Sequence, residues 1–509
     1  MEVKLDLLKK IKNAYDPFKE CVTMVDCVDS LYAIWAYYSF LLQKKEVPDI
    51  EYIREIELNK SNEYNFRYVS PWELELLARE ILVSSIESKH FDIPSFRSAK
   101  YFVNALNNLK SIGGVFEIEK VRRLTYVQFP WQGENHVIDG VNILVRYYNL
   151  FNHVTFEKKI REEYGLSLKK LFFVGFTLLS HFQNNFELRL PYKNKDIPDL
   201  KDQEIDAFLN KFSLALPEIR KRVEKEQAVD ENFLCRSICL KALPLIKLER
   251  SIVCPIPDFL LWSFTKNLYY TIYDQNKDSK IIGENFEKYI KKVIKAEIDI
   301  VDLFPKKKYG IEQKETSDYI IKYSKSLLFI EAKLKRIPFE AKTCLLDETA
   351  FNEELVKFSE SIVQTYKVIN DFINNEFSFS NKKQIVRYED DFLIYPIIVT
   401  LEDSYIWGSD SKLLEAEVCK RLEENQIQLN FVSRFPYLLC SAREFEKFIQ
   451  LIKNIDPDSF FKVRNRNEDT KRSTVNNLMY NFFNKDMEKN KKVLLKEEFV
   501  KIFPKGLII

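Results

Sequence analysis

Three residues in the stretch TSDYIIKYSKSLLFIEAKLKR, which begins at position 316, have side chains that could act together on a phosphate ester. Asp318 and Glu331 supply carboxylate oxygens, which are the ligands that Mg²⁺ prefers, and Lys333 supplies an ammonium group. A Mg²⁺ ion held in this way lowers the pKa of a bound water and stabilises charge on a phosphoryl oxygen. A lysine beside the ion can orient or deprotonate the attacking water. These residue types therefore suit phosphodiester hydrolysis.

The pattern around these residues predicts a β-hairpin. Two apolar segments, Tyr319–Ile321 and Leu327–Ile330, are separated by the polar segment Lys322–Ser326. If Ser324 and Lys325 form a two-residue turn, the two segments pair as antiparallel strands. The second segment is almost wholly apolar, which is typical of a strand inside a sheet that helices cover.

The register of this hairpin decides whether the three side chains meet. A two-residue turn pairs Tyr323 with Ser326. Counting outwards then places Asp318 directly opposite Glu331, with Cβ atoms roughly 5 Å apart. Lys333 follows Glu331 by two positions and returns to the same face of the strand. A turn of three residues would shift the register by one and carry Asp318 off this face.

The Glu-x-Lys spacing alone indicates no site, because it recurs at 87–89, 157–159, 312–314 and 340–342. A salt bridge at a strand end is the alternative interpretation of the three side chains. Burying these charges without a metal ion would be costly. The residues alone therefore leave both a metal site and a structural salt bridge open.

Helices and strands alternate in the C-terminal half, which predicts an α/β fold with a mixed sheet flanked by helices. The expected elements are a helix at 283–296, a strand at 297–304, the hairpin, a helix within 348–374, a strand at 392–401, a helix at 411–425, a strand at 435–441 and a helix at 442–454. The hairpin is antiparallel, whereas the later crossovers give parallel strands. Ser441 and Glu444 predict a capping box at the start of the last helix.

The N-terminal half has mainly helical spacing. Ser70, Pro71 and Glu73 are typical of a helix that begins with a capping box. Residues 113–150 differ, because a β-rich segment precedes an aromatic and polar mixture around Trp131, His136 and Asp139. We interpret the histidine as a core residue and the Asp-Gly pair as a turn, and we assign them no chemistry.

Length and composition predict more than one domain. The chain has 509 residues, of which 46% are apolar and 30% charged, as is typical of soluble globular proteins. We expect a mainly helical recognition or regulatory region at 1–250 with a small β-containing insert near 113–150, an α/β domain at 251–455 and a helical tail at 456–509. The formal net charge is only +2, so any affinity for nucleic acid must come from local basic patches.

Neither a secretory segment nor a membrane span is expected. The longest apolar stretch, near Leu171–Leu179, is much shorter than the roughly 20 residues that cross a bilayer. We therefore expect a cytoplasmic protein without a membrane partner. The eight cysteines form no C-x-x-C pair, which is typical of reduced thiols. Cys235, Cys239 and Cys254 are interpreted as buried structural thiols rather than zinc ligands, because no histidine is nearby.

The C-terminal half resembles the PD-(D/E)XK nuclease superfamily, which has the restriction-endonuclease-like fold. The resemblance covers roughly residues 280–453 and rests on GENFEKYI, SDYII, FIEAK and KFSESIVQTYK, in that order. It implies a core of order α-β-β-β-α-β in which Asp318 and Glu331 bind a divalent metal. The carbonyl of Ala332 would be a further ligand, and Lys333 would act on the water.

The resemblance also implies site residues on the neighbouring helices. Glu287 matches a glutamate of the first core helix, with Glu284 as the alternative. Gln364 matches a glutamine on the helix after Glu-x-Lys, and Lys357 lies seven residues earlier on the same helical face. The sequence departs from the pattern at Ser317, where the motif has proline.

Other acids are rivals for the metal. Asp299 and Asp302 lie on the strand that precedes the hairpin. A Pro-Asp pair also occurs at Pro257–Asp258, but it precedes the first core helix. We interpret this pair as a turn or a helix cap.

The leading prediction is a divalent-metal-dependent endonuclease that uses Mg²⁺, with Mn²⁺ as a substitute, to hydrolyse DNA. The resemblance implies products with 5′-phosphate and 3′-hydroxyl ends, and a role as a bacterial restriction or phage-defence effector. The lysines expected to hold substrate phosphates, together with one arginine, are Lys306, Lys307, Lys308, Lys335, Arg336 and Lys357. A solvated loop is the other interpretation of the three consecutive lysines.

Two other functions remain open. The first is a non-catalytic nucleic-acid-binding or scaffold protein that keeps the fold with an idle site. The second is a toxin-like effector that its N-terminal region silences. In the nuclease, residues 1–250 would recognise a target, a signal, a partner subunit or a second copy of the chain.

Overall fold

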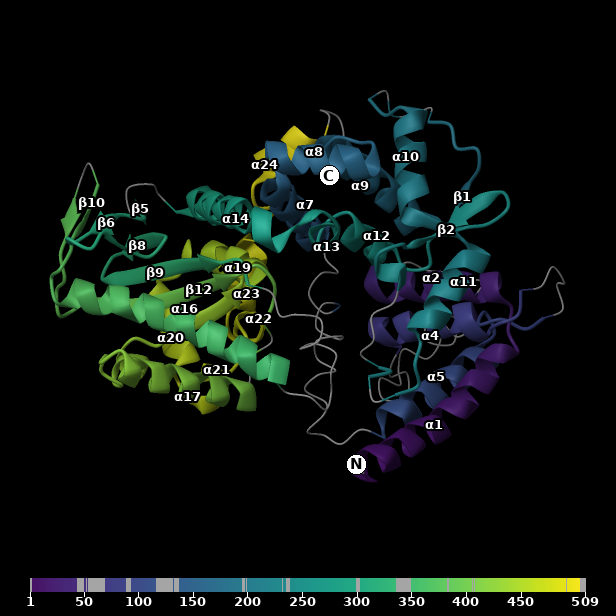
Figure 1. Cartoon of the computed structure of the whole chain (residues 1–509), viewed down its shortest axis with the longest axis horizontal. Coiled ribbons are helices and arrows are strands. Elements are labelled where there is room, and N and C mark those ends of the chain that lie inside the picture. The colour runs from purple at the N-terminus through teal and green to yellow at the C-terminus, as the bar shows by residue number, and fades with distance from the viewer. Residues whose placement is uncertain are drawn as a thin grey trace. The chain divides into compact units, whose positions relative to one another are not determined.

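The computed structural model describes most of the chain, and the described residues form two compact units (Figure 1). The described residues are 2–43, 50–51, 53, 69–87, 93–115, 131, 137–194, 197, 199–230, 232–234, 239–298, 303–335, 349–381, 384–404, 406, 408–490 and 492–503. The first unit contains the described residues up to 273 together with 499–503, and the second contains 274–335 and 349–498.

Helices make up most of the first unit. They are α1 (Glu2–Thr23), α2 (Cys27–Gln43), α4 (Pro71–Ser84), α5 (Ala99–Gly113), α7 (Val137–Phe151), α8 (Val154–Tyr164), α9 (Leu168–Asn184), α10 (Asp202–Phe212), α11 (Leu216–Glu226), the 3₁₀ helix η2 (Cys239–Lys241), α12 (Pro257–Ser263) and α13 (Leu268–Ile272). α4 begins as predicted, with Pro71 in its first turn and Glu73 Oε2 accepting a hydrogen bond of 2.7 Å from the Ser70 N–H. None of the described helices in the chain is long and apolar enough to cross a membrane.

A small sheet extends the first unit past the predicted boundary at residue 250. Its strands lie in the order β1-β4-β3-β2, with bounds β1 (Glu187–Arg189), β2 (Ser213–Ala215), β3 (Leu245–Lys247) and β4 (Ser251–Val253). β3 pairs with β4 in antiparallel fashion, so a boundary at residue 250 would cut this sheet. The division between the units instead falls after Tyr273. Pro257 and Asp258 thus belong to the first unit, where they form the first turn of α12.

The segment that contains Asp139 and Gly140 is the helix α7, so the interpretation of this pair as a turn was wrong. Val141 and Leu144 are buried at helical spacing, and this periodicity determines the local structure. Asp139 lies in the first helical turn, where a carboxylate interacts favourably with the helix dipole. His136 and the β-rich segment before it lie outside the described residues.

Two of the three cysteines considered as zinc ligands are buried thiols. Burial raises the pKa of Cys239 to about 12, and it also raises the pKa of Cys254 above its ordinary value. A buried thiol with a raised pKa is unreactive and poorly suited to bind metal. Cys235 lies outside the described residues.

The second unit has the predicted α/β composition. Its helices are α14 (Gln275–Glu297), α16 (Thr349–Ile373), α17 (Ser409–Glu424), α18 (Phe431–Arg434), α19 (Ala442–Ile452), α20 (Pro457–Arg464), α21 (Glu468–Lys471), α22 (Val475–Phe482) and α23 (Asn484–Asn490), while α24 (Lys496–Ile502) contains the division after residue 498. Its strands are β5 (Leu303–Pro305), β6 (Lys308–Tyr309), β7 (Lys314–Glu315), β8 (Tyr319–Tyr323), β9 (Ser326–Lys333), β10 (Phe379–Ser380), β11 (Ile385–Val386), β12 (Leu393–Thr400) and β13 (Leu438–Ser441).

Five of these strands form a mixed sheet in the order β13-β12-β9-β8-β5. β5, β8 and β9 are antiparallel neighbours, whereas β9, β12 and β13 are parallel. The predicted order of elements and the mixed strand directions are therefore confirmed. β9 is the central strand of the sheet and buried along its length, which explains its nearly continuous apolar sequence.

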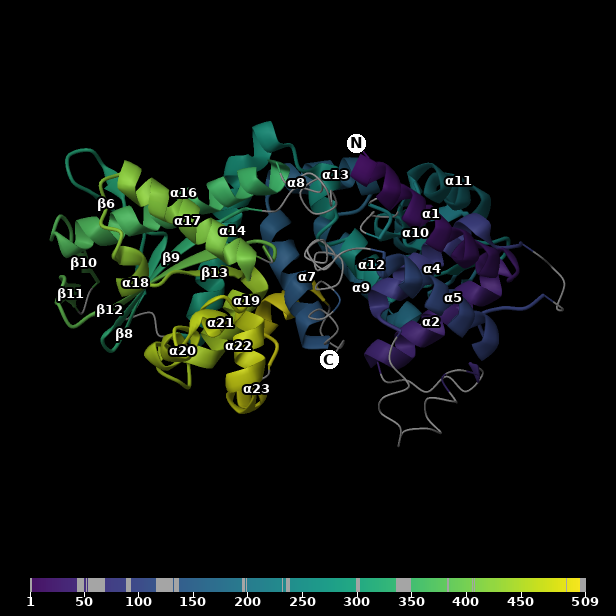
Figure 2. The ribbon, with the colours of Figure 1, turned by 90° about the horizontal axis from the view of Figure 1, so that it is seen from below.

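Helices cover both faces of this sheet (Figures 1 and 2). On one face, Tyr289 of α14 donates a hydrogen bond of 2.7 Å to Glu446 of α19. On the other face, Phe372 of α16 packs against Phe329 of β9, with ring centroids 5.8 Å apart. α17 lies against α16. α14 and α16 thus approach the same strands from opposite sides.

An aromatic cluster fills the space between α16 and the sheet. Phe372 is fully buried, and its ring centroid lies 5.0–5.9 Å from those of Phe329, Phe377, Phe379 and Tyr388. We call these five residues the Phe372 cluster. It fixes β9 against α16 near the middle of the sheet.

The sequence did not predict two short hairpins, β6–β7 and β10–β11. Tyr309 of β6 packs on Phe377, with ring centroids 4.5 Å apart, and donates a hydrogen bond of 2.7 Å to Asp371 Oδ2. Lys314 of β7 pairs with the same carboxylate at 3.5 Å. The β6–β7 hairpin is thereby fixed to the C-terminal end of α16.

Residues 456–490, expected as a separate tail, pack within the second unit. The ring of Phe461 in α20 stacks on that of Tyr395 in β12, with centroids 3.8 Å apart. The capping box at the start of α19 is present as predicted. Ser441 Oγ accepts from the Glu444 N–H at 3.2 Å, and Glu444 Oε2 accepts from the Ser441 N–H at 3.1 Å.

Candidate active site

The hairpin of β8 and β9 has the predicted register. Tyr323 pairs with Ser326, and Ser324 has φ 55°, as expected for a tight two-residue turn. The last pair at the other end is Tyr319 with Ile330, so Asp318 lies across from Glu331. The Ala332 N–H donates a hydrogen bond of 2.8 Å to Asp318 Oδ2, which fixes that carboxylate against β9. A three-residue turn is therefore excluded.

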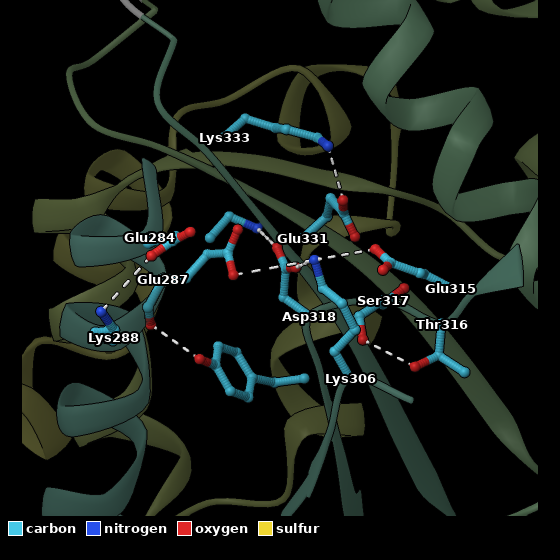
Figure 3. Close-up of polar contacts among 12 residues, drawn as sticks. Glu284, Glu287, Lys288, Lys306, Glu315, Thr316, Ser317, Asp318, Glu331 and Lys333 are labelled. Carbon is cyan, nitrogen blue, oxygen red and sulfur yellow. Dashed lines mark hydrogen bonds and ion pairs between the residues drawn. The ribbon is translucent and has the colours of Figure 1, made fainter. Parts of the chain in front are cut away.

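Lys333 joins the Glu331 carboxylate to α16. Its Nζ lies 2.7 Å from Glu331 Oε1 and donates a hydrogen bond of 3.0 Å to Gln364 Oε1. Glu331 is almost fully buried, with 5% of its surface exposed. Figure 3 shows the ammonium of Lys333 directed at the Glu331 carboxylate. The structure thus brings together Asp318, Glu331, Lys333 and Gln364.

Lys306 lies among carboxylates rather than in a solvated loop (Figure 3). Its Nζ lies 2.7 Å from Asp318 Oδ1, 3.6 Å from Glu315 Oε2 and 3.9 Å from Glu287 Oε2. Its N–H bonds to the Asp318 carbonyl at 2.9 Å and continues the pairing of β5 with β8. We call Glu287, Glu315, Asp318 and Glu331 the acidic cluster.

α14 presents Glu287 rather than Glu284 to the acidic cluster. Tyr319 Oη donates a hydrogen bond of 3.0 Å to the Glu287 carbonyl, which ties this turn of the helix to β8. Glu284 is one helical turn earlier, 51% of its side chain is exposed, and it pairs with Lys288 at 3.9 Å. Of the two glutamates that the resemblance leaves open, Glu287 is the one at the site.

Burial and mutual repulsion disfavour the charged forms of two of the acids. Burial raises the pKa of Glu331, the charge of Asp318 raises it further, and Lys333 and Lys306 offset part of the rise. The pKa of Glu287 is raised for the same reasons, first by burial and then by the charge of Asp318. Partial burial lowers the pKa of Lys306, but the Asp318 carboxylate outweighs it and the net shift is upward. Nearby positive charge therefore favours the ionised forms of both acids.

The donors of the site fit a hard cation held by few protein ligands. Asp318 Oδ1 is buried, and its partner is the Lys306 ammonium, whose Nζ lies 2.7 Å away. Across the described residues, no group of three or more His, Cys, Asp and Glu side chains is arranged to hold a metal ion. Mg²⁺ commonly uses one or two carboxylates and completes its shell with water and substrate phosphate. Asp318 and Glu331 suit that mode, with the Ala332 carbonyl as the further predicted ligand.

None of the remaining predicted lysines that the structure describes is shown paired with the acidic cluster. Lys335 Nζ donates a hydrogen bond to the Lys357 carbonyl, and burial lowers the pKa of Lys335 to about 8. The Lys357 ammonium pairs with Glu354 at 2.5 Å. Lys307 and Lys308 are exposed at the start of the β6–β7 hairpin. The other predicted residues, Arg336, Asp299 and Asp302, lie outside the described residues.

Sequence reasoning missed Glu315 and the place of Lys306 in the acidic cluster. The feature that would have revealed the position of Lys306 is the register of β5, in which Pro305 pairs with Tyr319. The next pair outwards is Lys306 with Asp318, so a correct alignment of these strands would have found the ion pair. Glu315 ends the inserted hairpin three residues before Asp318.

Comparison with known proteins found no matching family model, no similar curated protein and no similar solved structure.

Proposed function

We propose that the second unit is a divalent-metal-dependent nuclease of the PD-(D/E)XK type, with a restriction-endonuclease-like core that hydrolyses phosphodiester bonds of DNA in the cytoplasm. The main support is that Asp318, Glu331 and Lys333 converge at one end of the β8–β9 hairpin, where the Lys333 Nζ lies 2.7 Å from Glu331 Oε1. The order of elements from α14 to β12 agrees with the core that this fold requires.

Asp318 and Glu331 would hold Mg²⁺ or Mn²⁺ and set its position. When bound, such an ion lowers the pKa of a water and offsets charge on the phosphoryl oxygens. The Ala332 N–H fixes Asp318 through its other oxygen, so this carboxylate is already oriented before any ligand arrives. A preoriented ligand avoids the cost of reorganisation during the reaction.

Lys333 would position the attacking water. Its ammonium has three N–H donors, of which one faces Glu331 and one bonds to Gln364. The third donor can hold the water or a phosphoryl oxygen. The water oxygen would bond to phosphorus as the bond to the 3′ oxygen breaks. The water would release a proton to solvent and the 3′ oxygen would take one up, which leaves the 5′-phosphate and 3′-hydroxyl ends that the resemblance implies. Gln364 would keep the ammonium in place.

The first test is cleavage by the full chain. Purified protein is expected to cut plasmid DNA in Mg²⁺ or Mn²⁺ and to stop when EDTA removes the ion, because hydrolysis depends on a cation held by Asp318 and Glu331. The Lys333→Ala variant should remain folded, by circular dichroism, and lose cleavage. Wild-type cleavage that persists in EDTA would contradict the metal-dependent function. A parallel reaction on RNA identifies the nucleic acid.

Lys307 and Lys308 are expected to hold substrate phosphates beside the acidic cluster. Replacing both with Gln should weaken DNA binding and lower the slope of log affinity against log salt by about 2, because each phosphate contact releases about one counterion. The measurement is fluorescence anisotropy of labelled duplex without divalent metal. The control variant replaces Lys420 and Lys462, which are exposed in the same unit, and so removes the same charge elsewhere. If the two double variants lower the salt slope equally, the effect does not come from a phosphate site at Lys307 and Lys308.

One observation favours a second function, a nucleic-acid-binding or scaffold protein with an idle site. Lys306 and Lys333 each pair with a buried carboxylate, Asp318 and Glu331 respectively, so the site is internally charge-paired without a metal. DNA binding with no cleavage in Mg²⁺ or Mn²⁺ would favour this function. The first unit would then, as in the nuclease, supply recognition of a target, a partner subunit or a second copy. Restriction or phage defence is the setting we propose for either activity.

A further inference from the structure

Lys306 provides the acidic cluster with a positive charge of its own. Its Nζ lies 2.7 Å from Asp318 Oδ1 and within 4 Å of carboxylate oxygens of Glu315 and Glu287. Only 35% of its side chain is exposed. Figure 3 shows the ammonium between these carboxylates, with contacts to both sides. An ammonium and a hard divalent cation both bind negatively charged oxygen atoms, so the carboxylates of this site suit either one.

We propose that Lys306 and the divalent cation occupy Asp318 in alternation, so that the ammonium stabilises the metal-free site and leaves when the metal binds. This inference rests on the proposed function, because it concerns the metal that the nuclease would use. It assigns Lys306 the role of a built-in competitor that sets the metal affinity.

The oxygen atoms of Asp318 bring the two occupants into competition. Oδ2 already accepts a hydrogen bond of 2.8 Å from the Ala332 N–H, so Oδ1, the oxygen that Lys306 contacts, is the better placed to bind a metal. Mg²⁺ would lie roughly 2.0–2.1 Å from its ligand oxygen. With Lys306 still 2.7 Å from that oxygen, the two positive charges would lie only a few ångströms apart, and at that distance in a partly buried site their repulsion is strong.

The backbone of Lys306 is fixed beside the site, whereas its side chain has rotatable bonds that let the ammonium leave. Its N–H bonds to the Asp318 carbonyl at 2.9 Å, so the residue remains beside the site whichever cation is present. The four-carbon stem can rotate and carry the ammonium outwards. The released charge would then lie next to Lys307 and Lys308, where a substrate phosphate is expected. Metal binding would thus convert a partner of Asp318 into a ligand for DNA.

The alternative is a permanent ion pair that persists beside the bound metal. In that case Lys306 would still contact Asp318 in the loaded protein, and its removal would affect the metal-free and loaded forms alike. The two possibilities differ in whether the stability effect of Lys306 depends on metal.

Titration calorimetry with Mn²⁺ on the full chain separates these possibilities. Lys306→Met should bind Mn²⁺ at least about tenfold more tightly than wild type, because apparent affinity is reduced by the fraction of molecules that can bind. Lys420→Met, which removes the same charge from an exposed side chain elsewhere in the same unit, should stay within about twofold of wild type. Thermal unfolding gives the second readout. Metal-free Lys306→Met should melt below wild type, and saturating Mn²⁺ should bring the two melting temperatures together.

Each outcome decides the inference. Equal Mn²⁺ affinity in wild type and Lys306→Met, or a melting difference that persists in saturating Mn²⁺, would overturn it while leaving the nuclease intact. Absence of Mn²⁺ binding in both proteins would overturn the metal-dependent function as well. If Lys306→Met does not fold, Lys306→Gln replaces it, because its amide can still donate a hydrogen bond to Asp318.

Discussion

Asp318→Asn and Glu331→Gln are each expected to lower Mg²⁺-dependent DNA cleavage by at least about 10³-fold. Each substitution removes a carboxylate charge that would hold the ion, and the ion would stabilise the transition state. Both substitutions keep the size of the side chain. The contact between Asp318 and β9 is also kept, because an amide oxygen at position 318 can still accept from the Ala332 N–H. Plasmid cleavage under single-turnover conditions measures the effect.

Glu284→Gln is the matched control for these variants. Glu284 is on α14, one turn before Glu287, and it pairs with Lys288 outside the acidic cluster. Its replacement removes one carboxylate charge close to the site and should change cleavage by no more than about twofold. Wild-type cleavage by Asp318→Asn, in protein that melts as wild type does, would rule out the assigned role of Asp318.

Phe372→Ala should lower the free energy of unfolding of the second unit by about 3–5 kcal/mol, the usual cost of deleting a fully buried aromatic ring. The ring is fully buried and lies against four others of the Phe372 cluster, so its loss leaves a cavity. Whole domains have a free energy of unfolding of only about 5–15 kcal/mol, so this loss is a large fraction of the total stability. Hydrogen exchange of the β9 and α16 amides reports on this unit separately from the first.

Phe482→Ala tests whether the effect depends on burial. Phe482 ends α22 in the same unit and is 46% exposed, so its replacement should cost no more than about 1 kcal/mol. Similar loss of protection in the two variants would mean that the Phe372 cluster does not support the sheet. Phe329 lies two residues before Glu331 on β9, so a loosened cluster should also weaken Mn²⁺ binding.

The part of the site that lies within one hairpin could be predicted from the sequence. Turn length and the period of two fix which residues face each other, and these are local properties of residues 318–333. The order of helices and strands was equally accessible, because each long element carries its own periodicity or cap, as Ser441 and Glu444 do for α19. The confirmed features are thus those encoded over a few residues.

Contacts between distant segments could not be predicted in the same way. β5 has only three residues, and the β6–β7 hairpin separates it from β8, so no local pattern aligns Lys306 with Asp318. The pairing of Lys357 was missed for a related reason. Helical spacing places Lys357 and Gln364 on one face, but Glu354, three residues before Lys357, offers a nearer partner.

The acidic cluster and its lysines together carry four carboxylates but only two ammonium groups. With all groups ionised, these six side chains have a formal charge of −2, which disfavours a phosphate placed directly beside them. A single divalent ion cancels that surplus. The ion would therefore have to be in place before a scissile phosphate enters the acidic cluster, whereas DNA held by Lys307 and Lys308 alone would bind without being cut.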